Sequence, residues 1–131
     1  MAFLKFDEAL QLKGRKFEVL EVPELGGSLK LGALPAGKAL EFKELHAKVQ
    51  KAGGSDPALE RKQMVVLLTA GVVNEDESPF FADEKAALRF IEKVSFESLQ
   101  LIMVKLTDML KAAAKKDETP EGNSEGSSSG G

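Results

Sequence analysis

His46 is the only histidine in the chain and the first side chain to consider for chemistry. A catalytic or metal-binding histidine needs partners, such as a carboxylate, a hydroxyl nucleophile or further ligands at a fixed spacing. The chain contains no cysteine, and no carboxylate cluster at ligand spacing accompanies His46. We therefore interpret His46 as a solvated or partly packed side chain and expect neither a metal site nor thiol chemistry.

The acidic stretch NEDES, residues 74–78, is a second candidate because calcium binds carboxylate oxygens. A helix–loop–helix calcium site needs acids at alternating positions, a central glycine and a distal bidentate glutamate. The stretch has neither that glycine nor that register. A solvated turn is therefore the favoured interpretation.

The glycine and serine residues match no motif that cradles a phosphate or activates a nucleophile. PELGG and KAGGS fit neither GxxxxGK[ST] nor GxGxxG, and no serine lies in a GxSxG turn. We expect no cofactor and no enzymatic activity. A small cytosolic enzyme is the competing hypothesis, and a polar pocket around His46 would favour it.

Composition narrows the function classes further. The 131 residues carry a net charge of −3, and the 18 lysines and arginines are spread along the chain. Nucleic-acid binders concentrate cations on one face, so we expect no nucleic-acid partner. There is no apolar run of the roughly 20 residues that span a bilayer, and the N-terminus does not read as a secretory signal. We expect a soluble, intracellular protein.

The periodicity predicts an α+β fold that is mostly α, with an N-terminal β-hairpin followed by about four helices. The hairpin is expected over about 16–34, with Gly26 and Gly27 in its turn and Pro23 at a strand end. Its apolar positions change phase between 17/19 and 20/22, which indicates either a bulge or a strand covered on both faces. The first dozen residues fit a short helix or a strand. The helices are expected over about 36–52, 57–70, 84–94 and 96–116.

Caps and apolar patterns support these helices. Asp56 and Pro57 suit the start of the second helix, and Asp83 and Ser95 suit the starts of the next two. Because residues 64–68 are all apolar, we expect the second helix to be buried at the centre of the domain. Residues 1–116 then form one globular domain. Residues 117–131 form a disordered tail, because this acidic Ser/Gly stretch has no large apolar side chain to bury.

Some apolar side chains are candidates for binding another protein. One of the two phenylalanines after the acidic turn is expected to anchor it to the core, whereas one could project towards a partner. The last helix has an apolar face that is wide for a domain of this size, which fits core packing or a partner surface. The candidate interaction residues are Phe80, Phe81, Leu101, Met103 and Leu110.

The order of features resembles one protein family. A hairpin containing VPELGG, then VVNEDESPFF, then the helix pair in ADEKAALRFIEKVSFESLQLIMVKL, and finally a polar tail, resembles the tail assembly chaperones of long-tailed bacteriophages. The resemblance covers about residues 15–116, and its motifs are structural rather than catalytic.

This resemblance implies a function. Such chaperones coat the tape-measure protein before the tail tube polymerises around it, they self-associate, and they are absent from the finished virion. Many also exist in a longer form, made by ribosomal frameshifting, that recruits the major tail (tube) protein. The resemblance therefore implies viral tail assembly in the host cell cytoplasm. The alternative is a structural tail-completion or head–tail connector protein.

The polar tail fits three interpretations. Under the resemblance it is a tether onto which the frameshifted extension is joined. A conjugation tail would require a ubiquitin-like β-grasp core, which one hairpin and four helices do not match. GSSSGG could also be a cloning linker.

Overall fold

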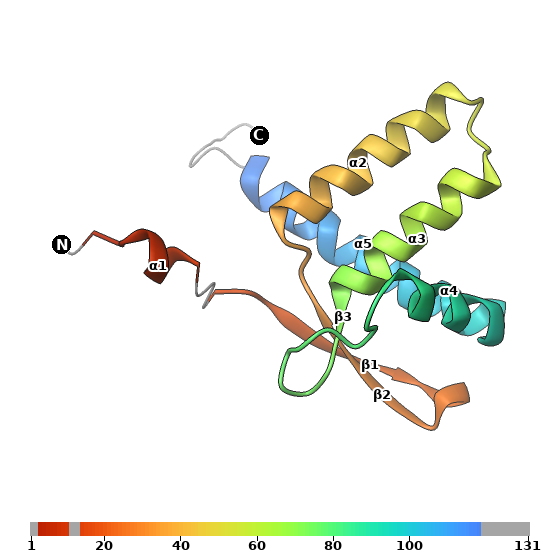
Figure 1. Ribbon diagram of the computed structural model, residues 1–131, viewed down its shortest axis with the longest axis horizontal. Helices are drawn as coiled ribbons and strands as arrows, with labels where there is room; N and C mark the ends of the chain where they lie inside the picture. The colour runs from red at the N-terminus through yellow and green to blue at the C-terminus, as the bar shows by residue number, and fades with distance from the viewer. Residues whose placement is uncertain (1–2, 11–13, 119–131) are drawn as a thin grey trace.

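The structure is a computed structural model that describes residues 3–10 and 14–118. A three-stranded antiparallel sheet lies against a set of helices, and a short N-terminal helix stands apart from both (Figure 1). The elements in chain order are α1 (Phe6–Ala9), β1 (Phe17–Val22), the 3-10 helix η1 (Pro23–Leu25), β2 (Gly27–Gly32), α2 (Ala36–Lys51), α3 (Pro57–Gly71), β3 (Val72–Val73), α4 (Glu84–Lys93) and α5 (Phe96–Glu118). The predicted fold class is confirmed.

The hairpin forms where it was predicted, but its turn and register differ from our expectation. β1 pairs with β2 without interruption from Phe17 opposite Gly32 to Val22 opposite Gly27, so the expected bulge is absent. The strand is not covered on both faces either, because Val19 on the same face as Phe17 is 71% exposed. Val22 is buried in the core, while Phe17 lies under the Lys30 ammonium, 4.7 Å from the ring centroid. The aromatic ring is thus shielded by a cation rather than by the core.

The hairpin turn requires one glycine rather than two. η1 follows directly after β1, and Gly26 ends it with φ of 72°. Gly27 already belongs to β2 and pairs with Val22. A side chain with a Cβ is strained at such a positive φ, so glycine suits position 26 specifically.

α3 lies at the centre of the body, as its apolar run predicted. Residues 65–68 are all buried, and the helix contacts α2, α4, α5, β2 and β3. Asp56 caps its N-terminus by accepting hydrogen bonds from the amides of Ala58 and Leu59. α3 is therefore the element on which the other helices and the sheet pack.

Gly71 is needed for close packing as well as for ending α3. A Cβ at this position would lie 2.5 Å from Cδ2 of Leu106, a fully buried residue of α5. The missing side chain therefore allows α3 and α5 to approach each other. The residues after it, Val72 and Val73, form the third strand, which we did not predict. Two residues are too few to show a strand period.

The helix boundaries agree closely with the predicted ranges. α5 continues to Glu118, so residues 117 and 118, which we had assigned to the tail, are helical. The rest of the predicted tail lies outside the described residues. The first dozen residues include α1, a single turn with no buried residue. Within the described ranges, no helix combines the length and apolar character needed to cross a bilayer.

Candidate protein-binding site

The structure separates the five predicted interaction residues. Phe80 is 44% exposed and Leu101 is 46% exposed, whereas Phe81 is only 6% exposed and belongs to the core. Met103 and Leu110 are half-buried, and Met103 packs against the core. Phe80 and Leu101 are therefore the two whose side chains a partner could contact most fully.

Phe81 anchors the loop that follows β3. Its ring lies edge-on to Phe80 at 5.1 Å and tilted against Phe90 of α4 at 5.3 Å, measured between ring centroids. Such aromatic pairs add to the stabilisation that comes from burial alone. The buried phenylalanine thus fixes the position from which Phe80 projects.

The acidic turn before these rings is held by its own side chains. Asp76 accepts hydrogen bonds from the amide and the hydroxyl of Ser78, at 3.0 and 2.6 Å. The hydroxyl contact is the main cause that lowers the pKa of Asp76 below its ordinary value. Lys30 pairs with Glu77 at 3.2 Å and so ties the turn to β2. Among residues 3–10 and 14–118, no three His, Cys, Asp or Glu side chains are grouped as a metal site.

The structure places His46 at the surface of the body. It is exposed on α2, and its ring stacks at 6.5 Å on that of Phe42, one helical turn earlier. It lines neither of the two grooves described below. This placement agrees with the interpretation of His46 as a partly packed surface side chain.

A groove of about 800 Å³ runs between the hairpin and the first half of α5. We call it the clamp groove. Its apolar part includes Leu20 of β1 together with Leu101 and Val104, which lie three residues apart on the outer face of α5. Leu101 and Val104 are 46% and 53% exposed. Spaced by one helical turn, they form a short apolar stripe on the side of α5 opposite its buried residues.

The charges around the clamp groove are mostly acidic. Glu24, Glu97 and Asp108 line it, against a single cation, Lys105. Lys105 is itself paired with Glu18 of β1 at 2.5 Å. An apolar floor with an acidic edge favours a partner surface that is apolar at its centre and basic at its margin.

Glu24 joins the tip of the hairpin to the start of α5. Its Oε1 accepts hydrogen bonds from the hydroxyls of Ser95 and Ser98, at 2.6 and 2.5 Å, and from the amide of Ser95 at 3.2 Å. Hydrogen bonds from Ser95 and then Ser98 lower the pKa of Glu24, because they stabilise the carboxylate form. We call this set of contacts the Glu24 clamp. It sets the spacing between the two walls of the groove.

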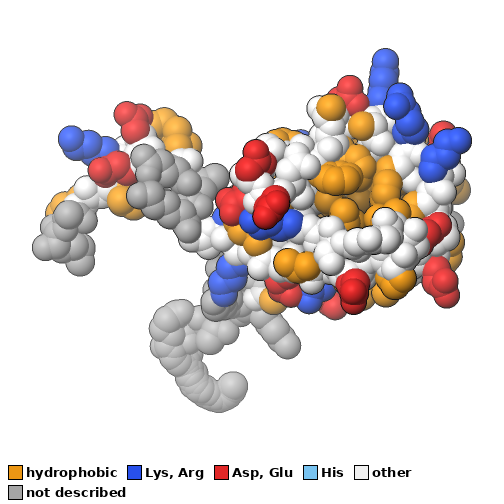
Figure 2. Space-filling view, turned by 90° about the horizontal axis from the view of Figure 1, so that it is seen from below, with side chains coloured by type: hydrophobic (Ala, Val, Ile, Leu, Met, Phe, Trp, Pro, Cys, Tyr) orange, Lys and Arg blue, Asp and Glu red, His pale blue; other side chains and the backbone are white. Residues whose placement is uncertain are grey.

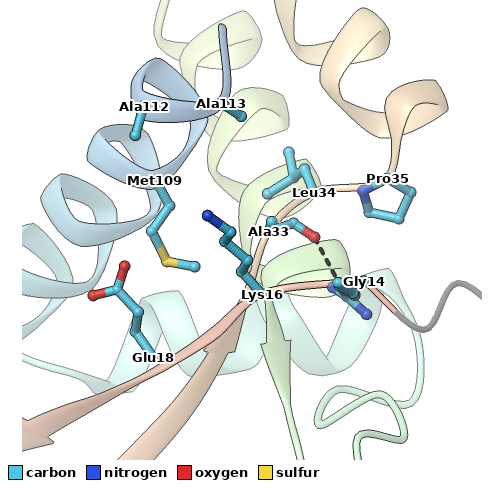
Figure 3. Close-up of a pocket in the computed structure, with 10 residues that line it drawn as sticks. Gly14, Lys16, Glu18, Ala33, Leu34, Pro35, Met109, Ala112 and Ala113 are labelled. Carbon is cyan, nitrogen blue, oxygen red and sulfur yellow. Dashed lines mark hydrogen bonds between the residues drawn. The ribbon is translucent and has the colours of Figure 1, made fainter. Parts of the chain in front are cut away.

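A second groove, of about 750 Å³, lies beside the other half of α5 (Figure 3). We call it the linker groove, because one wall is the segment between β2 and α2. Most of its lining is apolar or small, and Lys16, just before β1, and Glu18 of β1 reach towards it from below. Its apolar lining residues are Ala33, Leu34, Pro35, Met109, Ala112 and Ala113. Lys105 lines the clamp groove and Glu18 lines the linker groove. The ion pair between them therefore lies where the two grooves adjoin.

Sequence reasoning identified only part of these surfaces. Leu101 was predicted as an interaction residue, but Val104 was missed. Val104 lies three residues after Leu101 and four before Asp108, and this spacing indicates that the three share one face of the helix. Ser95 was predicted as a helix cap, and its hydroxyl accepts from the amide of Ser98 at 3.1 Å. Its partner Glu24 lies 71 residues earlier in the chain, and no local sequence pattern indicates this contact.

Figure 2 shows apolar side chains gathered in a hollow on one face of the body, with charged groups around it.

Comparison with known proteins shows that this chain is similar in fold to a solved structure. No family model matches the chain, and no curated protein matches it. The tail assembly chaperone of bacteriophage HK97 has a similar solved structure, with a TM-score of 0.53 and 19% identity. The likeness covers 72% of this chain and 85% of that one. At this identity, the conclusion is that the chain shares its fold with a phage tail assembly chaperone.

Proposed function

We propose that this protein is a phage tail assembly chaperone that works by binding proteins rather than by catalysis. The observation that carries the proposal is the fold shared with the HK97 tail assembly chaperone, combined with an open apolar groove on α5. The tape-measure protein is the proposed partner, in the host cell cytoplasm. The chaperone would be absent from the finished virion.

The clamp groove is the proposed contact with the tape-measure protein. A long protein that will later fill a tail tube exposes apolar helical surface before that tube exists. An amphipathic helix, about 10–12 Å across, can place its apolar side on Leu20, Leu101 and Val104. Basic residues along its edges would then face Glu97 and Asp108.

Weak single contacts suffice when many copies act together. We propose that the chaperone self-associates along the tape-measure protein, so that each bound copy raises the effective concentration of the next. We also propose that a frameshift-extended form recruits the major tail (tube) protein through residues added after the polar tail. Stepwise displacement by tube protein would then release the coat.

Co-expression with the tape-measure protein tests the binding proposal. The chain should keep the tape-measure protein soluble, and Leu101→Gln combined with Val104→Gln should abolish most of this effect. Each substitution removes an exposed apolar group that a helix would cover, so folding should be unchanged. Equal solubility of the tape-measure protein with the double variant would reject the clamp groove as the site.

Leu40→Gln is the matched control, because Leu40 is 61% exposed on α2 and lines neither groove. It should retain full chaperone activity. Mass spectrometry of purified virions tests the assignment against a tail-completion or connector protein. Detection of this chain at structural stoichiometry would refute the chaperone proposal.

A further inference from the structure

The N-terminal residues Phe3–Leu10, which we call the arm, present apolar side chains that the rest of the described chain does not cover. Phe3, Leu4 and Phe6 are 86%, 77% and 76% exposed, and Leu10 is 59% exposed. The arm lies away from the body in both views (Figures 1 and 2). A single helical turn such as α1 has little stability without tertiary contacts. Contiguous exposed apolar groups of this kind mark an interface.

The linker groove has the size and chemistry to receive such an arm. Its volume of about 750 Å³ falls within the range of about 300–1,000 Å³ that is typical of pockets for sizeable ligands. The lining is largely apolar, which suits phenylalanine and leucine side chains. Arg15 and Lys16 line the groove together with Glu18, while the arm carries Asp7 and Glu8 together with Lys5. The groove thus has one more cation than anion and the arm has one more anion than cation, so their net charges are opposite.

We propose that the arm of one copy of this chain occupies the linker groove of a second copy. This rests on the self-association proposed above and specifies how it occurs. Gly14, at the base of the arm, is itself a lining residue of the groove, while α1 projects away from the groove of its own chain. Each copy thus offers an arm in one direction and a groove at its base.

This geometry predicts an open assembly rather than a closed dimer. The arm and the groove are different surfaces, so the contact is heterologous, and such contacts form chains unless the rotation closes a ring. A chain of copies suits the coating of an extended partner. The clamp groove lies on the other side of the Lys105–Glu18 pair and stays open in each copy.

Two variants of the full chain separate the two halves of the contact. Phe3→Ser with Phe6→Ser removes the arm's aromatic rings and leaves the groove intact. Ala112→Glu with Ala113→Glu places carboxylates in the groove, where they occupy space and repel Asp7 and Glu8. Analytical ultracentrifugation should show that the wild-type mass rises with concentration. Each variant should self-associate at least about tenfold more weakly.

Mixing the two variants gives the decisive result. The groove-blocked variant still has an arm, and the arm variant still has an open groove, so the mixture should form a one-to-one heterodimer that does not grow. Leu40→Ser is the control and should associate like the wild type. Absence of heterodimer, as when each arm folds onto its own groove, would overturn the inference.

The remaining outcomes also decide the question. Undiminished association of the arm variant would overturn the arm contact while leaving self-association through another surface. A wild-type chain that stays monomeric at all concentrations would overturn both, and the tape-measure co-expression test would still stand on its own. Circular dichroism checks that the variants fold; should the groove variant unfold, the arm variant mixed with wild type should cap chains and lower their mass.

Discussion

Gly71→Ala should destabilise the protein, because α3 and α5 approach each other through this glycine. The added Cβ would lie 2.5 Å from Cδ2 and 3.4 Å from Cδ1 of Leu106. Leu106 is fully buried, so its side chain can give way only by moving against other core side chains. Overpacking of this kind costs about 1–3 kcal/mol.

One effect opposes this cost, and the backbone adds no further cost. Alanine has a higher helix propensity than glycine by up to about 1 kcal/mol, and the gain is smaller here because Gly71 is the last residue of α3. The φ angle at Gly71 is not positive, so alanine adds no backbone strain. We expect a net loss of about 1–2 kcal/mol in the free energy of unfolding.

Urea unfolding followed by circular dichroism measures this effect. With a mid-range m-value of about 2 kcal/mol per molar urea, the midpoint should fall by roughly 0.5–1 M. Gly37→Ala is the matched control, because a Cβ there meets no atom within 4 Å in α2. That variant should be neutral or slightly stabilised, by up to about 1 kcal/mol.

A double-mutant cycle tests the stated cause. Leu106→Ala alone should cost about 2–5 kcal/mol by leaving a cavity. In the Gly71→Ala background it should cost at least about 0.5 kcal/mol less, since the new methyl group partly fills that space. Additive free energies, or a Gly71→Ala variant as stable as wild type, would refute the packing argument.

Two further predictions concern the elements that position the surface. Because hydrogen bonds lower the pKa of folded Glu24 below its ordinary value of 4.5, the Glu24 clamp should stabilise the fold above that pH and lose its effect as pH falls through the folded pKa. Glu24→Gln should therefore lower the urea midpoint at pH 7, and this deficit should shrink as the pH is lowered towards the acid range. A deficit that stays constant as the pH falls would contradict the clamp. Phe81→Ala should cost about 3–5 kcal/mol, against less than about 1 kcal/mol for Phe80→Ala, in thermal or urea unfolding. Similar losses would show that the two rings are not divided between core and surface.

Local sequence signals predicted most of the helical architecture. Asp56, Asp83 and Ser95 each mark a helix start through a side-chain cap, and these caps act within three residues of themselves. The central position of α3 followed from its consecutive apolar residues, since a helix that is apolar on most sides must be covered by several neighbours. These features were predictable because the interactions that create them are short in sequence.

The candidate site was only partly predictable, for a related reason. Leu101 could be recognised as apolar on a helix, but its exposure depends on which face of α5 meets the core. Phe80 and Phe81 are identical in type and adjacent, and packing against Phe90 and the rest of the core determines which one is buried. The spacing of apolar residues in the sequence does not show which of two adjacent phenylalanines is buried.

The sequence by itself determined the helices, the hairpin and the lack of any recognisable catalytic motif, because caps, turns and periodicity act over a few residues. Tertiary structure alone decided the pairing of β3, the Glu24 clamp across 71 and 74 residues, and the two grooves beside α5. The physical reason is that a groove and a long-range hydrogen bond exist only once distant segments have packed together. Both depend on the relative positions of segments that are distant in the sequence, and no local sequence pattern encodes those positions.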